Sequence, residues 1–241
     1  SSKLYTKDDF SFTGDDTHKT VSGTNAGSYN MELVSEDFTN NNKNFDNVEF
    51  KIVDGKLDIA QRRVTLTSGT DSKTYDGKPL TKDGVTVSGD GFVKGEEPTY
   101  NVTGTITNAG SVKNTFTYTF AEGVVQENYD ITKEEGTLTV APIDKVVVTI
   151  TGKTDSKIYN GKEQKVENYE VSISDAKYKE NDFKFSGKAI AKGTDAGTYK
   201  MGLKDSDFKN TNKNFKNVEF KVTDGELTID PKEVTLTSGS S

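Results

Sequence analysis

The chain has 241 residues, a formal net charge of −7 and no cysteine. An acidic chain without a clustered Lys/Arg stripe meets an electrostatic penalty against nucleic acid, and the lack of cysteine excludes disulfides and thiolate metal sites. No apolar run approaches the roughly 18 residues of a membrane span, so we expect neither a nucleic-acid partner nor membrane insertion. Hydrophobic content is only 31%, yet 13 Phe and 10 Tyr are too many for a disordered chain. This composition predicts small, sheet-rich units with thin cores.

Apolar side chains alternate with polar ones in several stretches, which is the period of a β-strand. In chain order these stretches are residues 29–33, 48–52, 116–120 and 146–150. Gly, Asn and Asp clusters between them supply the turns expected of an antiparallel sandwich. No stretch has a helical period, so we predict an all-β protein.

Long segments of the chain occur twice. The sequence NKNFDNVEFK begins at Asn42 and NKNFKNVEFK begins 170 positions later at Asn212. A shorter cycle lies inside this one, because VTLTSGTDSKTYDGK from Val64 aligns with VTITGKTDSKIYNGK from Val148. The repeat unit is therefore about 85 residues long, in two alternating types, which is too long for a solenoid repeat.

The period predicts a tandem array of small antiparallel β-sandwich modules of about seven strands, forming an elongated rod. Ig-like topology is preferred, with a β-grasp-like sheet as the alternative. Residues 1–61, the first repeat, form an incomplete module that lacks its opening strands. Residues 62–145, the second repeat, and residues 146–231, the third repeat, are full modules. Residues 232–241 are the opening strand of a following module.

The two related copies differ mainly on one face. Apolar pairs such as Phe50/Phe220 and Leu57/Leu227 keep their character, whereas Asp46/Lys216 reverses charge, as do Lys56/Glu226 and Arg63/Glu233. Conserved inward positions with drifting outward ones are expected of a spacer, in which only the packing has to be repeated.

The chain resembles the MBG/YDG-type tandem repeats of large bacterial surface adhesins. The resemblance is carried by SKTYDGKPL at Ser72, SKIYNGKEQ at Ser156, the Ala-Gly-x-Tyr element at Ala26 and Ala196, and NYDITKEEGTLTVAP at Asn128. It implies a multidomain extracellular protein, commonly anchored to a Gram-positive cell wall, whose repeats form a stalk or contribute to adhesion. It implies no catalytic residue.

Few side chains are candidates for chemistry. His18 is the only histidine, so no triad or zinc site can be completed around it, and we expect a solvated loop residue. The acidic pairs Asp8/Asp9 and Asp15/Asp16, together with Asp205, lack EF-hand spacing and are better explained by turns than by calcium. We therefore predict no catalytic, metal-binding or cofactor-binding residue, and no cofactor.

Most aromatic residues fall at core positions of the expected strands, and there is no Trp for a sugar platform. Tyr75 and Tyr159 follow a turn at the module start and are interpreted as packing anchors under the Asp-Gly and Asn-Gly turns rather than as ligands.

We expect a non-enzymatic stalk that projects a binding domain from the cell wall, with neighbouring repeat modules as its partners. The short connections 140–148 and 58–66 contain no flexible tether, which favours stiff joints. The alternative is an adhesive module whose loops bind a mucin-like host glycan or an extracellular-matrix protein. A hydrolase that uses the acidic pairs is disfavoured, because nothing places two carboxylates on a common floor.

The ends suggest self-association. YTKDDF at Tyr5 matches YKENDF at Tyr178, so the first repeat has no counterpart of the third repeat's opening strands. VTLTSG at Val234 repeats the opening strand at Val64. A sheet with a missing neighbour exposes backbone that can accept a strand, so we predict head-to-tail pairing of residues 234–237 with the first repeat of another copy. Alternatively the tail packs on its own last module, and the first repeat forms a smaller sheet that suffices by itself.

Overall fold

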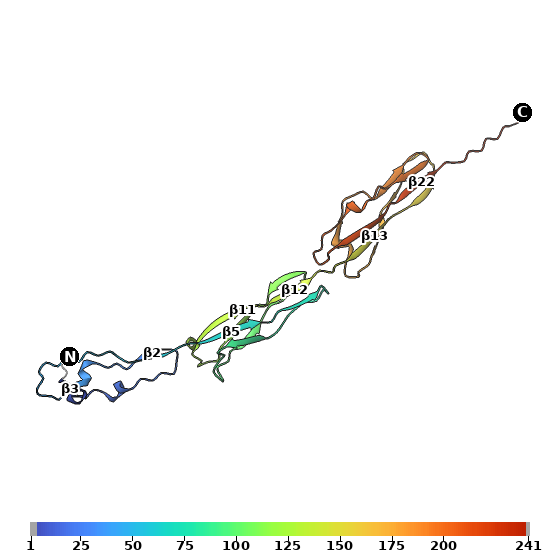
Figure 1. Cartoon of the computed structure of the whole chain (residues 1–241). Helices are drawn as coiled ribbons and strands as arrows, with labels where there is room; N and C mark the ends of the chain where they lie inside the picture. Colours follow the sequence, from blue (N-terminus) through green and yellow to red (C-terminus); the bar gives the residue numbers. More distant parts are fainter. Residues whose placement is uncertain (1–3, 240–241) are drawn as a thin grey trace. The chain divides into compact units, whose positions relative to one another are not determined.

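The computed structural model describes residues 4–239, and its strands follow the chain from blue to red in Figure 1. Regular structure in this range consists of short strands and of 3-10 turns of three or four residues. This confirms the predicted all-β class. None of the helical turns among the described residues is long and apolar enough to cross a membrane.

The chain divides into two compact units, and the division crosses the second repeat. Unit 1 contains the described residues up to Gly69, with Asp83–Val102 and Thr115–Gly136. Unit 2 contains Thr70–Lys82, Thr103–Asn114 and the described residues from Thr137 onward. The module boundaries at 61/62, 145/146 and 231/232 stay a prediction, and residues 1–3 and 240–241 of the outer segments lie outside the described range.

The third repeat lies in unit 2 and holds the most closed core. Its strands are β13 (Val146–Gly152), β14 (Asp155–Ile158), β15 (Gln164–Glu167), β16 (Tyr169–Ile173), β17 (Phe183–Phe185), β18 (Ile190–Gly193), β19 (Gly197–Lys200), β20 (Phe208–Asn210), β21 (Val218–Thr223) and β22 (Glu226–Asp230). They are more numerous than the roughly seven strands expected of a module. The sheets are β16-β13-β21, β14-β22-β19, β15-β18 and β17-β20.

Strand β13 shows why this sequence forms a core. Val146, Val148 and Ile150 alternate with valine or threonine, and all three are 0% exposed. They pack in one cluster with Tyr178 and Phe215. Alternation with period two turns every second side chain to the same face, so β13 buries an unbroken apolar row.

The sheets are mixed, so the expectation of purely antiparallel modules is wrong in this respect. β13 runs parallel to β21, and β14 runs parallel to β22. Parallel neighbours need a long crossover, and here the intervening strands of the same repeat provide it. Sequence alternation indicates which face a strand buries but not the direction of its partner.

The second repeat shows the same mixture. Its strands are β5 (Arg62–Ser68), β6 (Asp71–Thr74), β7 (Val85–Gly89), β8 (Thr99–Val102), β9 (Gly110–Lys113), β10 (Phe116–Thr119), β11 (Tyr129–Glu134) and β12 (Thr137–Ala141). Unit 1 contains the sheets β11-β5-β7 and β10-β8, and unit 2 contains β6-β12-β9. β5 is parallel to β11, as β13 is to β21.

The first repeat is more open. Its strands β1 (Phe10–Phe12), β2 (Gly27–Asn30), β3 (Phe38–Asn40) and β4 (Lys56–Ile59) form only the pairs β1-β3 and β2-β4. Residues 48–53 form no strand, so the strand predicted at Val48, Phe50 and Ile52 is wrong. The third-repeat equivalent, β21, is a strand because β13 lies beside it, and no described residue takes that place in the first repeat.

The expected turns are present. Asp76 Oδ1 accepts from the Lys78 N–H at 2.9 Å, and the following Gly77 has φ +81°. Asn160 and Gly161 repeat this turn, with Asn160 Oδ1 at 2.9 Å from the Lys162 nitrogen and φ +75° at the glycine. The side-chain oxygen replaces a backbone acceptor, and glycine supplies the positive φ at low cost.

The tail, residues 232–239, contains no strand. Val234 is 77% exposed and Leu236 is 92% exposed. The alternative in which the tail packs on the third repeat is therefore wrong. That residues 232–241 are the opening strand of a following module stays a prediction. A lone segment has no neighbour to complete its backbone hydrogen bonds, so its strand propensity is not realised.

Candidate functional site

Two equivalent contacts join segments of different repeats, and each uses one asparagine side chain. In unit 1, Asn128 Oδ1 accepts from the Ala26 N–H at 2.7 Å, while its Nδ2 donates to Asn25 Oδ1 at 3.0 Å. In unit 2, Asn214 Oδ1 accepts from the Ala109 N–H at 2.6 Å, while its Nδ2 donates to Asn108 Oδ1 at 3.0 Å. We call this contact the junction clamp.

Each junction clamp binds an Asn-Ala-Gly turn. The glycines that follow, Gly27 and Gly110, have φ of +155° and +148°, in a region that residues with a Cβ rarely adopt. The turn presents one backbone donor and one side-chain acceptor. A primary amide offers both complementary groups, so one asparagine satisfies the pair where a hydroxyl or a carboxylate would leave one group less well matched.

A chain of asparagines positions the clamp residue of the third repeat. Asn210 Nδ2 donates to the Asn212 and Phe215 carbonyls, at 3.1 and 3.0 Å. Asn212 Oδ1 in turn accepts from the Asn214 N–H at 2.9 Å, and its Nδ2 donates to Asp182 at 2.7 Å. These bonds hold the loop so that the Asn214 side chain, which is buried, faces the turn.

The first repeat builds the same loop. Asn40 Nδ2 donates to the Phe45 carbonyl at 2.9 Å, and Asn42 Oδ1 accepts from the Asn44 N–H at 3.0 Å. Asn44 is exposed and clamps no turn among the described residues. The repeated NKNF sequence is therefore explained by a local asparagine network, whose polar contacts are kept as faithfully as the apolar core.

Tyr178 anchors this network. Its hydroxyl donates toward Asn210 Oδ1 at 3.1 Å and the Asp182 carbonyl at 3.2 Å, and its ring meets Phe215 edge-on at 4.9 Å. Burial raises the pKa of Tyr178 to about 12, with a further contribution from the Asp182 charge. Tyr5 makes the equivalent bonds to Asn40 and Asp9 in the first repeat, but it is only half-buried.

This raised pKa predicts an alkaline step in stability. Because the folded pKa of Tyr178 lies above the unfolded value of about 10, its contribution is complete below pH 10 and is lost as the pH rises towards 12. We expect Tyr178→Phe to remove this step from pH-dependent unfolding of the third repeat, followed by amide exchange in β13. Tyr5→Phe is the matched control and should leave β13 unchanged; an unaltered step in Tyr178→Phe would contradict the assignment.

The connections between repeats are hydrogen-bonded rather than free. In unit 1, Gln61 Nε2 donates to the Glu127 carbonyl at 2.8 Å. In unit 2, Ile143 pairs with Phe215 as a parallel bridge, because its N–H donates to Asn214 and its carbonyl accepts from Lys216. This bridge is parallel, as the β13-β21 pair is, so the connection adds one bridge to that pairing.

Tyr75 and Tyr159 have different environments. Tyr75 packs edge-on against Phe215 at 5.8 Å between ring centroids, which confirms its role as a packing anchor. Tyr159 is 38% exposed, so the same interpretation is wrong for this residue. The two tyrosines lie at equivalent turns, but only the Tyr75 ring packs against Phe215.

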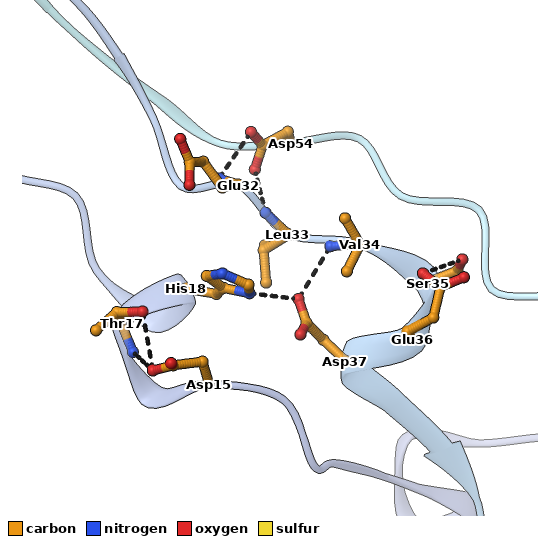
Figure 2. A network of polar contacts seen from close by, with 10 residues as sticks. All are labelled: Asp15, Thr17, His18, Glu32, Leu33, Val34, Ser35, Glu36, Asp37 and Asp54. Carbon is orange, nitrogen blue, oxygen red and sulfur yellow. Dashed lines mark hydrogen bonds and ion pairs between the residues drawn. The ribbon is translucent and has the colours of Figure 1, made fainter.

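His18 is not a solvated loop residue, and that prediction is wrong. It lies in the 3-10 turn η2 (Asp16–Lys19), its side chain is 24% exposed, and its Nδ1 lies 2.9 Å from Asp37 Oδ2. Asp37 is buried and also accepts from the Val34 N–H at 2.9 Å. Figure 2 shows the imidazole directed at this carboxylate from across the loop. The pairing joins residues 19 positions apart, which sequence spacing does not reveal.

The His18–Asp37 contact predicts a pH dependence for the first repeat. The hydrogen bond to Asp37, aided by the charges of Asp37, Asp15 and Glu32, raises the pKa of His18 above its ordinary value. A raised folded pKa stabilises below the unfolded pKa of about 6.5, and this contribution is lost as the pH rises through the folded value. Conversely, the bond from Val34 and then that from His18 lower the pKa of Asp37, so its contribution is lost in acid.

We therefore expect the first repeat to lose stability as the pH rises from the ordinary histidine pKa of about 6.5 through the raised folded pKa of His18, and His18→Gln to flatten this change. The chain has one histidine, so its ring proton signal in NMR reports the pKa without ambiguity. A midpoint at or below the ordinary value would contradict the contact.

The acidic pairs serve turns. Asp15 Oδ1 accepts from the Thr17 N–H at 2.9 Å, and Asp9 Oδ2 accepts from the Thr6 N–H at 2.6 Å. Asp205 begins the 3-10 turn η6 (Asp205–Asp207), and its Oδ1 also accepts from the Val222 N–H at 3.2 Å. Their interpretation as turn residues is confirmed. In the part of the chain that the structure describes, no group of three or more His, Asp or Glu side chains could hold a metal ion.

Sequence reasoning missed the junction clamp. The Asn-Ala-Gly turns at Asn25 and Asn108 and the Asn-aromatic pairs at Asn128 and Asn214 are visible as repeated motifs. What the sequence does not show is that each turn meets the asparagine of the next repeat, more than 100 positions away in the chain.

The described residues form sheets without long helices, the sequence repeats, and the same contact recurs between successive repeats; together these features define an all-β tandem-repeat protein. Residues 146–231 match the model of the MBG domain family, which is consistent with an MBG-type repeat domain in this part of the chain, as the resemblance implied. The family is one of non-enzymatic repeats and is compatible with a surface protein. No curated protein and no solved structure matches the chain.

Proposed function

We propose that the chain is a non-catalytic spacer: repeats of an extracellular bacterial surface protein that hold a binding domain away from the cell wall as an elongated, stiffly jointed rod. The junction clamp carries this proposal. It occurs at both connections between repeats with the same atoms and nearly the same distances. A contact that recurs with the repeat period stabilises the joint between neighbours, which is the property that a spacer needs.

Three further features support the proposal. The connections bond to the following repeat through Gln61 and Ile143, so they do not behave as flexible tethers. Aromatic residues such as Phe208 and Phe215 are used in cores instead of forming an exposed platform. The MBG match at residues 146–231 is compatible with a repeat of a surface protein, for which a Gram-positive cell wall is the setting implied by the resemblance.

Small-angle scattering on the full chain tests the joints. We expect a maximum dimension well over twice the cross-section, and we expect the Asn128→Ala/Asn214→Ala double variant to show the scattering of a more flexible chain. Asn44→Ala is the matched control, because Asn44 lies in the same sequence context and clamps no turn among the described residues. A compact profile, or identical profiles for all three proteins, would overturn the rod.

Binding experiments separate a spacer from an adhesive module. The full chain is passed at increasing concentration over immobilised mucin and over extracellular-matrix proteins. A spacer gives no saturable signal on either surface. Saturable binding would instead assign the loops to a host glycan or protein, and it would overturn the pure spacer without affecting the joints.

A further inference from the structure

The chain contains a single Asn-Gly pair, Asn160–Gly161, in the turn between β14 and β15 of the third repeat. An asparagine side chain can react with the backbone nitrogen of the next residue, because the two groups are held close together in one chain. A glycine in that place has no Cβ to block the approach and lets the backbone rotate into position. This pair therefore has the composition that favours a reaction between neighbouring residues.

The turn is open to solvent. Asn160, Gly161 and Lys162 are all exposed, and Ile158 before the turn is 65% exposed. A Cβ added to Gly161 would have no atom of the described residues within 4 Å beyond its own chain neighbours. Water and hydroxide therefore reach both the side-chain amide of Asn160 and the backbone nitrogen that would attack it.

The turn also polarises the amide that would react. Asn160 Oδ1 accepts from the Lys162 N–H at 2.9 Å. Negative charge develops on this oxygen when a nucleophile adds to the amide carbon, and a donor that is already in place stabilises that charge. The hydrogen bond that forms the turn thus also favours attack on Cγ of Asn160.

The backbone nitrogen that follows each asparagine differs in its freedom to react. The next smallest residue after an asparagine is alanine, which follows Asn25 and Asn108. The junction clamps hold both of these alanine N–H groups, at 2.7 and 2.6 Å from the clamp oxygens. Each of these bonds must break before the nitrogen can lose its proton and turn towards the side chain. The Gly161 N–H makes no hydrogen bond within the described residues, so no such bond delays it.

The second repeat shows that the same turn accepts a carboxylate. Asp76 takes the place of Asn160 and accepts from the Lys78 N–H at the same 2.9 Å, and the glycines that follow have φ of +81° and +75°. Lys73 Nζ also lies 2.8 Å from Asp76 Oδ1. The hydrogen bonds from Lys73 and then Lys78 lower the pKa of Asp76, so the turn favours its charged form. Lys157 is the counterpart of Lys73 in the third repeat.

We propose that Asn160 is a site of spontaneous deamidation, which converts the turn of the third repeat into the Asp-Gly turn of the second. The Gly161 nitrogen gives its proton to water or hydroxide and bonds to Cγ of Asn160. The bond from Cγ to the side-chain nitrogen breaks, and this nitrogen takes up a proton and leaves as ammonia. Water then opens the cyclic imide at either carbonyl, which gives aspartate or an isoaspartyl linkage. One water is consumed for each ammonia released, and the chain gains one negative charge.

The two products differ in the main chain. Aspartate keeps the backbone of the turn and places a carboxylate where Asp76 has one, beside the counterpart of Lys73. An isoaspartyl linkage adds a carbon to the main chain and cannot reproduce the turn. The modification does not depend on the proposed spacer function.

A series of NMR spectra of the 15N-labelled full chain at mildly alkaline pH measures the reaction. The side-chain amide signals of each asparagine report its own conversion. We expect the Asn160 signals to disappear several-fold faster than those of Asn25 and Asn108, and ion exchange to resolve a species with one more negative charge. Loss of the Asn160 signals at the rate of the other two would overturn the proposal.

Three variants test the mechanism and the product. Gly161→Ala has room for its methyl group, and we expect it to slow the loss of the Asn160 signals several-fold. Gly77→Ala makes the same change in the equivalent turn of the second repeat and should leave that rate unchanged. Asn160→Asp supplies the expected product, so its spectrum should coincide with that of one aged species. An unchanged rate in Gly161→Ala, or no aged species that matches Asn160→Asp, would overturn the proposal.

Discussion

Replacing Leu227 with alanine is expected to destabilise the third repeat by about 2–5 kcal/mol, the cost of a cavity in a closed core. Leu227 is 0% exposed and lies on β22, which has β14 on one side and β19 on the other. Its neighbours Met201, Leu203 and Ile229 are themselves buried, so little around the site can move to fill the space. Denaturant-dependent amide exchange in β22 and β19 measures the loss locally, which is needed because two compact units share one chain.

The chain contains a matched control for this change. Leu57 occupies the equivalent position in the first repeat, on β4, which pairs only with β2. Because Leu57 is half-buried, less apolar surface is withdrawn from water and no closed cavity forms, so Leu57→Ala should cost less than half as much. Equal losses at the two sites would mean that the first repeat is as closed in solution as the third.

Replacing Asn214 with alanine is expected to open the junction clamp of unit 2 and to speed exchange of the Ala109 amide. In the native chain Asn214 Oδ1 holds this N–H at 2.6 Å from its nitrogen. Removing the Asn214 amide leaves the Ala109 N–H and Asn108 Oδ1 without this partner, which lowers the free energy of local opening by about 1–3 kcal/mol. This loss corresponds to an exchange rate at Ala109 that is raised about 5- to 150-fold. Amide exchange by NMR at Ala109 is the measurement.

Three companion variants locate the effect. Asn214→Asp keeps an acceptor for Ala109 but loses the donor to Asn108, so Ala109 should keep much of its protection. Asn128→Ala should release Ala26 and leave Ala109 unchanged, because its clamp belongs to the other unit. Asn44→Ala should change neither amide. Faster exchange at Ala109 in all variants would show general destabilisation instead of a clamp.

Local chemistry could be predicted because it depends on neighbours in the sequence. The alternation of Val146, Val148 and Ile150 predicts the buried face of β13, and no further information is needed for it. The Asp-Gly turn at Asp76 and the Asn-Gly turn at Asn160 follow in the same way from side-chain oxygens and glycine. The all-β class and the repeat period rest on such signals.

Side-chain partners far apart in the chain could not be predicted. His18 is a lone residue in the sequence, and only the fold brings it to a buried Asp37. Asn128 and Asn214 are ordinary turn formers until each meets an Asn-Ala-Gly turn of another repeat. Spacing within a motif carries no information on such contacts, because they depend on how whole repeats meet.

The sequence by itself determined that this protein is a set of small β units with aromatic cores, since periodicity and turn chemistry act over a few residues. The tertiary structure decided which of those segments became strands. NVEFK occurs at Asn47 and at Asn217, yet only the second copy contributes a strand, β21, because β13 completes its backbone hydrogen bonds. A strand is stable only beside a partner, and the partner lies elsewhere in the chain.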